Sequence, residues 1–497
     1  MSILNVNKIN PVGGGSTVTI AGIASVTNNI SVGNSVTASS FHGDQIKLGD
    51  NKKILLGEGN DIEIYHTGSV DMIESKSLYL IQEAQNHIFR NLAGDEFYAK
   101  FFGNGSVELY HDNTKRIETT SSGITVSGTS TADAFIPSQG QLSHRNLIIN
   151  GAMTIAQRST SITQSSGYGS VDRIIFDYGG IGAHIPQAQV DVSSGTTPYT
   201  LGFRKAFKIT NGNQGSSLPT AGYISIIYKI EAQDIATSGW NYKSASSYVT
   251  LSFWVKASVA QNYYFRFQTK DGTSYNYPME TGSLTANTWT KITKTIPGNS
   301  NLQIDNDNGE GPKIEWATAW GTDSTSSSVN LNQWAAYSDG TKTPDQTTTW
   351  YTTNNATFEI TGVQLEVGSV ATPFEHRSYG EELFRCQRYY QKQQNVTNQP
   401  FGVGNIDGSN QGQLHVKLTT TMRDRPTLET TGSAGDYGLR VRTTQTCTAV
   451  PVLPSSTAFT DSVFLEIPRS GHGFSDGQAC FCVAINNNAF LAFNAEL

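Results

Sequence analysis

The chain has 497 residues, of which 15% are charged and 10% are aromatic, with 48 glycines and a formal net charge of -7. This charge gives no basic field for gripping phosphates, so nucleic acid is excluded as a main partner. No apolar run approaches the roughly 20 residues that span a bilayer, and the first residues lack the charged and apolar blocks of a signal peptide, so we expect a chain made in the cytoplasm with no membrane insertion.

The composition favours strands over helices. The length suits roughly two to four domains, and abundant Gly, Ser, Thr, Asn and aromatic residues are typical of short strands joined by tight turns. The four cysteines, Cys386, Cys447, Cys480 and Cys482, are too few and too unevenly spaced for a disulfide scaffold. Because Cys480 and Cys482 lie two apart, a strand would point both to one face, and we interpret them as small core residues rather than metal or redox ligands. The sequence therefore predicts an all-β fold.

Residues 1–50 alternate Val and Ile with Ser, Thr and Asn between glycine turns. A pattern this thin buries too little apolar area in one chain to offset the entropy of ordering it. We therefore expect an N-terminal β-structured segment that needs partners.

A repeat follows in residues 51–140. The segments "IEIYHTGSVDMIES" (62–75) and "VELYHDNTKRIET" (107–119) each predict a β-hairpin, with an Asn-Gly turn after a further strand at "FYAKFFGNG". The residues that correspond are Glu63 and Glu108, Tyr65 and Tyr110, His66 and His111, and Glu74 and Glu118. The two histidines have no second ligand at metal spacing, so we interpret them as polar residues at strand ends. Repeated hairpins that cover one another's open faces predict a shaft.

A small-residue linker near residue 140 leads into the aliphatic strand expected at "NLIIN" and then into a longer aromatic-rich region, 141–375. Its expected strands alternate apolar and polar residues with no helical pattern between them, which predicts a jelly-roll-like β-sandwich. These strands are "YISIIYKI" (223–230), "YVTLSFWVKAS" (248–258), "NYYFRFQTK" (262–270), "TWTKITKTI" (288–296) and "ATFEITGVQLEVG" (356–368).

The run "ATPFEHRSYGEELFRCQRYYQK" (371–392) concentrates charge in an otherwise charge-poor chain and resembles an active site at first sight. A helical wheel instead places Tyr379, Leu383, Cys386 and Tyr390 on one apolar stripe, and Glu381 precedes Arg385 by four residues. We therefore predict a helical connector over 376–398, with its stripe packed on a neighbouring surface. A C-terminal β domain, 399–497, follows and is expected to end in a hairpin around "INNNAFL".

Motifs for catalysis are missing from the sequence: it contains no G-x-S-x-G, no G-x-x-x-x-G-K-[ST] and no H-E-x-x-H. The densest acidic loop, "NLQIDNDNGEGPKIEW", departs from the EF-hand pattern at the turn glycine and at the bidentate glutamate. We interpret it as a solvated loop, with a calcium site through Asp305 and Asp307 as the alternative. No other cofactor is expected, and we predict that the chain is not an enzyme.

Aromatic residues in polar loops are the more informative feature. Sugar rings stack on aromatic faces while neighbouring polar groups bind their hydroxyls, so these residues predict a carbohydrate-binding surface. The alternative is that the rings belong to the core or edges of the sandwich. The residues predicted to contact glycan are Tyr275, Tyr277, Trp320, Trp334 and Trp350.

Three segments in order, "YHDNTKRIETTSSGITVSG", "NLIINGAMTIAQRST" and "FEITGVQLEVGSVATPFEHRSYGEELFRCQRYYQK", resemble tail-fibre and related appendage proteins of tailed bacteriophages, particularly marine and cyanobacterial ones. The resemblance implies a homotrimeric, elongated β-structured virion appendage. It implies that residues 1–50 attach to other phage tail or virion proteins, and that the distal end faces the host. It also implies that 141–375 is similar to carbohydrate-binding modules, and that 399–497 forms a receptor-binding tip for bacterial surface glycan or lipopolysaccharide.

Two other functions remain open. One is a tailspike depolymerase that cleaves the same glycan, which needs facing carboxylates in a cleft and usually a long β-helix whose strand ladder the sequence lacks. The other is a baseplate, nozzle or capsid-fibre component that makes no receptor contact.

Overall fold

The computed structural model describes residues 45–76, 79–128, 144–163 and 166–497. The chain divides into two compact units, Met1–Asp133 and Ala134–Leu497. Strands dominate both units, which confirms the all-β prediction. Most of the predicted N-terminal attachment segment, up to residue 44, lies outside the described residues. No helix in the described ranges is long and apolar enough to cross a membrane.

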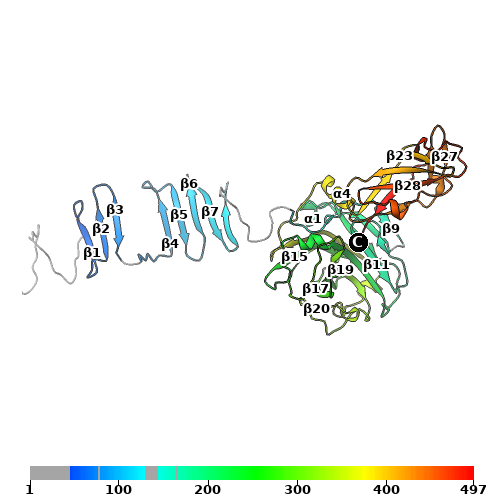
Figure 1. Cartoon of the computed structure of the whole chain (residues 1–497). Helices are drawn as coiled ribbons and strands as arrows, with labels where there is room; N and C mark the ends of the chain where they lie inside the picture. Colours follow the sequence, from blue (N-terminus) through cyan, green and yellow to red (C-terminus); the bar gives the residue numbers. More distant parts are fainter. Residues whose placement is uncertain (1–44, 77–78, 129–143, 164–165) are drawn as a thin grey trace, which may run out of the picture. The chain divides into compact units, whose positions relative to one another are not determined.

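The described part of the first unit consists of two antiparallel sheets, each a single layer of strands (Figure 1). The three-stranded sheet contains β1 (Lys53–Leu56), β2 (Ile62–His66) and β3 (Asp71–Ser75), and the five-stranded sheet contains β4 (Asn86–Arg90), β5 (Phe97–Phe102), β6 (Val107–His111), β7 (Thr114–Thr120) and β8 (Gly123–Val126). The predicted hairpins are β2–β3 and β6–β7, as the repeat indicated.

One face of each sheet carries the paired glutamates of the repeat. Glu63 lies directly across from Glu74, and Glu108 lies across from Glu118. Two opposed carboxylates would repel each other, but lysines bind at least one carboxylate of each pair. The Glu63 carboxylate binds Lys53 and Lys76, and Lys115 binds both Glu108 and Glu118.

The opposite face of each sheet is apolar and exposed. In the three-stranded sheet, Ile54, Ile64 and Ile73 form one cross-strand row, and 36%, 37% and 56% of their surfaces are exposed. In the five-stranded sheet, a row across all the strands consists of Phe89, Ala99, Leu109, Ile117 and Val126. All the clusters of buried apolar side chains found among the described residues lie in the second unit, so these rows have no covering layer within their own sheets.

The second unit begins with a sandwich of two antiparallel sheets, which confirms the predicted β-sandwich (Figure 1). Within the described residues, the seven-stranded sheet has the order β10 (Gly167–Tyr168), β11 (Ile174–Gly179), β14 (Tyr223–Glu231), β19 (Glu310–Trp320), β16 (Asn262–Gln268), β17 (Tyr275–Ser283) and β20 (Ala335–Ala336). The six-stranded sheet has the order β18 (Thr290–Pro297), β15 (Tyr248–Ala257), β21 (Thr357–Val367), β13 (Lys205–Thr210), β12 (Gln187–Asp191) and β9 (Ser161–Ile162).

Aromatic side chains from both sheets fill the space between them. Phe253 of the six-stranded sheet contacts Phe265 and Trp316 of the seven-stranded sheet edge to face, with ring centroids 5.1 and 5.5 Å away. The helical segments around the sandwich are the short α1 (Thr197–Thr200), α2 (Ala232–Ala236), η2 (Asp339–Thr341) and α3 (Thr349–Thr352).

The "NLIIN" segment is not a strand, contrary to the prediction. It runs beside β21, where Leu147 N donates to Leu365 O and Val363 N donates to Gly151 O. The Asn146 side chain replaces part of the backbone hydrogen bonding that a strand would make with β21, because its Oδ1 accepts hydrogen bonds from the backbone amides of Ile148 and Leu365.

Helix α4 (Tyr379–Gln387) follows the sandwich at the place where the connector was predicted, capped by Ser378, whose side chain accepts a hydrogen bond from Glu381 N. The stripe differs from the prediction. Tyr379 is 65% exposed because it occupies the first, solvated turn, and Tyr390 is buried but already belongs to β22. Leu383 and Cys386 do pack inward, against Ile149, Ile155 and Tyr389 of the same chain.

The C-terminal domain consists of two further antiparallel sheets. In the described residues, the three-stranded sheet has the order β22 (Tyr390–Gln394), β30 (Phe490–Asn494) and β25 (Thr427–Thr430). The six-stranded sheet of this domain has the order β27 (Thr444–Thr446), β26 (Tyr437–Arg440), β29 (Ala479–Ala484), β23 (Pro400–Asp407), β24 (Gln411–Lys417) and β28 (Ser462–Pro468). The 3-10 helices η3 (Ala434–Asp436) and η4 (Ser455–Thr457) lie in its loops. Cys480 and Cys482 are buried in its core, as predicted.

The predicted terminal hairpin is wrong. β29 pairs with β23 and β26, whereas β30 pairs with β22 and β25 in the other sheet. The Asn-rich turn therefore passes the chain from one sheet to the other. Alternation and turn residues mark the two strands but carry no information about which partner each one takes.

Candidate functional site

A pocket of about 410 Å³ opens on the outer face of the six-stranded sheet. This volume falls within the range of roughly 300–1,000 Å³ that is usual for small-molecule sites. We call it the Trp254 pocket, and the side chains that shape it are Leu201, Phe203, Trp254, Lys291, Phe374 and His376.

Trp254 occupies an outward position of β15. Its neighbours Phe253 and Val255 point into the core with no exposed surface, so alternation places the half-buried indole on the other face. Lys291 of β18 is the direct cross-strand partner of Trp254. The register of the two strands therefore sets an aromatic ring beside an ammonium group.

A β-bulge makes room for these rings. The pairing of β15 with β21 shifts between Ser252 and Trp254, opposite Gly362. Gly362 has φ +62°, and a Cβ there would lie 2.7 Å from Phe203 Cζ and 3.1 Å from Trp254 Cδ1. Only glycine fits this position, so the bulge and the absent side chain together form the floor of the pocket.

Two loops complete the walls. Phe203 and Phe374 meet edge to face with ring centroids 4.8 Å apart, and the His376 ring lies 5.1 Å from Phe203. His376 Nε2 donates a hydrogen bond to Leu201 O at 2.8 Å, which ties the loop at 371–376 to the loop at 201–203.

A buried carboxylate holds the 371–376 loop in place. Glu366, 2% exposed, accepts hydrogen bonds from Thr372 N at 2.9 Å and from Thr372 Oγ1 at 2.6 Å. Gln364 donates to the same carboxylate at 2.8 Å and accepts from Glu375 N. The pocket is thus built on side chains that have fixed partners.

The lining of the Trp254 pocket combines apolar rings, hydroxyl groups and one cation, and it includes no Asp or Glu. Rings and hydrogen-bonding groups suit binding of a sugar. Glycoside hydrolysis ordinarily needs two carboxyl groups, which this lining does not offer.

The structure corrects three of the predicted glycan contacts. Tyr277 and Trp320 are 3% exposed and Trp350 is fully buried, so none of them presents a face to a sugar. Trp320 Nε1 donates to Ser225 Oγ and Trp350 Nε1 donates to Thr357 O, which satisfies both indoles inside the fold. Tyr277 lies in β17, Trp320 is the last residue of β19 and Trp350 lies in α3, so all three belong to elements rather than to the polar loops in which they were predicted.

The other two predicted contacts, Tyr275 and Trp334, are half-buried against the core. Trp334 packs on Tyr277 with ring centroids 5.1 Å apart and donates Nε1 to Pro297 O at 2.7 Å. Neither residue lines the Trp254 pocket. Sequence reasoning missed that pocket, and the signal for it was an aromatic residue at an outward position of a long alternating strand.

The acidic loop does not bring a set of metal ligands together. Asp305 Oδ1 accepts from Gln303 Nε2, and Asp307 Oδ1 accepts from the amide of Gly309. No group of three or more His, Cys, Asp or Glu side chains in the described ranges is arranged to hold a metal ion. Burial raises the pKa of nearby Asp271, and the charges of Asp305 and Asp307 add to this effect.

The charged residues of 371–392 are engaged in structural contacts. Arg377 donates to the backbone carbonyls of Asn146 and Ile148, and Glu382 accepts from Asn150 N. Arg388 binds Glu231 of β14. These contacts hold residues 371–392 against residues 146–150 and against β14 of the sandwich, immediately before the C-terminal domain begins.

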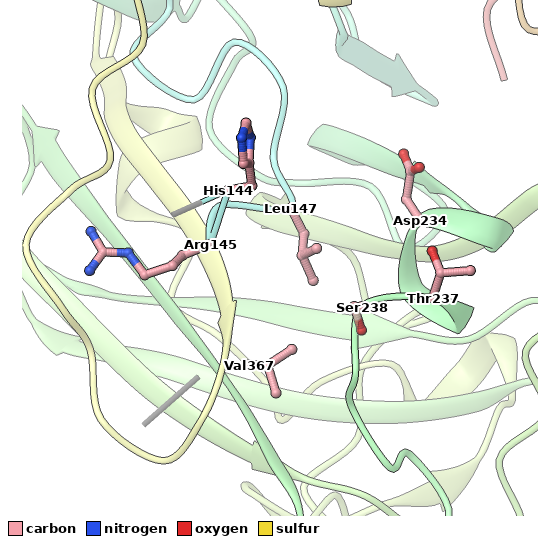
Figure 2. Close-up of a pocket in the computed structure, with 7 residues that line it drawn as sticks. All are labelled: His144, Arg145, Leu147, Asp234, Thr237, Ser238 and Val367. Carbon is pink, nitrogen blue, oxygen red and sulfur yellow. The ribbon is translucent and has the colours of Figure 1, made fainter. Parts of the chain in front are cut away.

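A second pocket, of about 190 Å³, lies between residues 144–147, α2 and the end of β21. Figure 2 shows Leu147 and Val367 beside Asp234, Thr237 and Ser238. Burial raises the pKa of Asp234, and the neighbouring Glu231 raises it further. This pocket is smaller than the usual ligand range and has no aromatic wall.

The outer face of the seven-stranded sheet holds a buried ion pair. Arg266 and Glu315 are cross-strand partners, 1% and 6% exposed, and Arg266 Nε lies 2.9 Å from Glu315 Oε2. Burial raises the pKa of Glu315, but Arg266 and Lys313 outweigh burial and bring the pKa to about 2.

No protein-family model matches the chain, and no curated protein sequence matches it. Among solved structures, similar chains include the enzymatically active domain of bacteriophage CBA120 tailspike protein 4 (9% identity, TM-score 0.24, covering 45% of this chain and 21% of that one). Others are the family 11 carbohydrate-binding module of Clostridium thermocellum, solved with a β-1,3-1,4-mixed-linked tetrasaccharide (13%, 0.20, 43% and 98%), and a xylan-binding domain from Paenibacillus barcinonensis (9%, 0.20, 42% and 95%). These TM-scores are low, so the likenesses assign no function to this chain.

Proposed function

We propose that the chain is a homotrimeric tail-fibre protein of a tailed bacteriophage, located in the virion, which binds glycan on the bacterial surface through its second unit. The N-terminal region attaches it to other virion proteins. The order of the three tail-fibre-like segments supports the phage assignment.

The Trp254 pocket is the observation that carries the binding function. It joins an outward tryptophan, a lysine and a histidine on a floor that only Gly362 permits. This favours an adhesive fibre over a baseplate, nozzle or capsid-fibre component without receptor contact.

The two-faced sheets of the first unit support the trimer. Their apolar rows recur at corresponding places in the repeat, since Ile64 corresponds to Leu109 and Ile73 to Ile117. Three copies that turn these rows toward a common axis cover them with identical surfaces and leave the charged faces in water.

We propose that the chain binds the glycan without cleaving it. The acid-free lining of the Trp254 pocket favours an adhesin over the depolymerase, because cleavage requires facing carboxylates.

The test is a glycan array of bacterial surface polysaccharides probed with the full chain, with release of reducing ends measured in parallel. We expect binding without release. Absence of binding to every host polysaccharide would overturn the adhesin, and released oligosaccharide would favour the depolymerase.

A further inference from the structure

We propose that the Trp254 pocket selects an acidic sugar, with the sugar ring stacked on the indole of Trp254 and a sugar carboxylate bound by the ammonium group of Lys291. This inference rests on the proposed glycan-binding function and names the class of glycan for that site.

Lys291 differs from Lys256, which alternates with Trp254 along β15 and so lies on the same face of the sheet. Lys256 pairs with Glu359 at 2.9 Å. Lys291 is exposed, lines the pocket and has no hydrogen bond or ion pair with any described residue. The cation at the mouth of the pocket is therefore available for an anion supplied by a ligand.

The lining reinforces this charge preference. Since no carboxylate of the chain lines the pocket, an acidic ligand meets attraction from Lys291 without opposing repulsion. Glu366, which holds the 371–376 loop of the wall, is buried and already accepts three hydrogen bonds from Thr372 and Gln364.

The spacing of Trp254 and Lys291 suits one sugar residue. Direct cross-strand partners have Cβ atoms about 5 Å apart, so a ring that covers the indole places its substituents within reach of the lysine. On the other side, the hydrogen bond from His376 Nε2 to Leu201 O leaves Nδ1 as the ring nitrogen that can bind a sugar hydroxyl.

The experiment compares each glycan bound on the array with its carboxyl-reduced form, in which the acid is converted to a primary alcohol. We expect carboxyl reduction to weaken binding about tenfold, the usual effect of losing one charge-assisted hydrogen bond. Lys291→Gln should weaken binding of the acidic form to the same extent and leave the reduced form unaffected, while Lys291→Arg should retain the preference.

Lys294→Gln is the matched control. It removes the same charge from the same strand, but three residues along a strand place it on the opposite face, so glycan binding should stay unchanged. Both lysines are at least partly exposed, so neither variant is expected to disturb folding.

The outcomes separate the two claims. Equal binding of acidic and reduced glycans, or binding confined to phosphorylated glycans, contradicts the acidic-sugar inference but leaves the adhesin intact. Failure of every glycan to bind overturns the adhesin and the inference with it. Loss of binding in Lys294→Gln as large as in Lys291→Gln would show that general charge, rather than the pocket, is responsible.

Discussion

Arg388, just after α4, pairs with Glu231, at the end of β14. The Glu231 side chain has no exposed surface, Arg388 Nε lies 3.0 Å from its Oε2, and Tyr389 donates to the same oxygen at 2.7 Å. Burial raises the pKa of Glu231, but these hydrogen bonds outweigh burial and lower it. The pair joins the sandwich to the C-terminal domain through the segment whose charge density suggested catalysis.

Arg388→Met should lower the free energy of unfolding by about 3 kcal/mol, because it leaves a buried carboxylate without its cation. The control is Arg385→Met, which breaks a half-exposed pair with Glu381 on the same helix and should cost under about 1 kcal/mol. Urea unfolding measures both variants. Equal effects would contradict a structural role for the Arg388 pair.

Glu315→Gln should destabilise the sandwich in a pH-dependent way. The folded-state pKa of Glu315, about 2, lies below the ordinary 4.5, and this difference corresponds to about 3 kcal/mol. Because the pKa is lowered on folding, this stability is present above pH 4.5 and is lost as the pH falls toward 2. Unfolding measured from pH 7 to pH 2 should show the gap between wild type and variant shrinking in that window, whereas a constant gap would disprove the assignment.

Gly362→Ala should damage both the fold and the pocket. The new methyl group would overlap the Phe203 ring, and φ +62° is strained for alanine, so we expect a loss of about 1–3 kcal/mol together with weaker glycan binding. Gly380→Ala is the control, because nothing lies within 4 Å of its added Cβ in helix α4. A neutral effect at Gly362 would show that the bulge tolerates a side chain.

Leu109→Asp should break the trimer. In three copies the change brings three carboxylates to the apolar faces that the proposal places together, which costs far more than one exposed charge. Ile88→Asp makes the same change on the opposite face of that sheet, where Ile88 pairs with Lys100, and should leave assembly intact. Light scattering at micromolar concentration should give a trimer for wild type and Ile88→Asp; a wild-type monomer would overturn the trimer.

The sequence predicted five strands of the sandwich, β14, β15, β16, β18 and β21, because alternation in segments such as 248–258 and 356–368 reports directly which side chains face the core. It missed others, such as β19, whose first residues were interpreted as part of the acidic loop. Pairing could not be predicted in the same way. The turn before β30 looked like a hairpin, yet the partner of β30 is fixed by long-range packing against β22 and β25.

The Trp254 pocket could not be predicted from the sequence because it also depends on contacts between distant parts of the chain. Trp254, Lys291 and Phe374 are separated by 37 and 83 residues in the chain. The register of β15 with β18 brings Trp254 and Lys291 together, and Phe374 comes from the loop after β21. Conversely, Trp320 and Trp350 were predicted to lie in polar loops, but Trp320 ends β19 and Trp350 lies in α3, and both are buried.

A structure of the full chain bound to a glycan captured from the array tests the central claim most directly. We predict a sugar ring stacked on Trp254, with its carboxylate in hydrogen-bonding distance of Lys291 Nζ and a hydroxyl at His376 Nδ1. An ordered glycan on the seven-stranded sheet or on the C-terminal domain, with nothing bound at Trp254, would contradict the account.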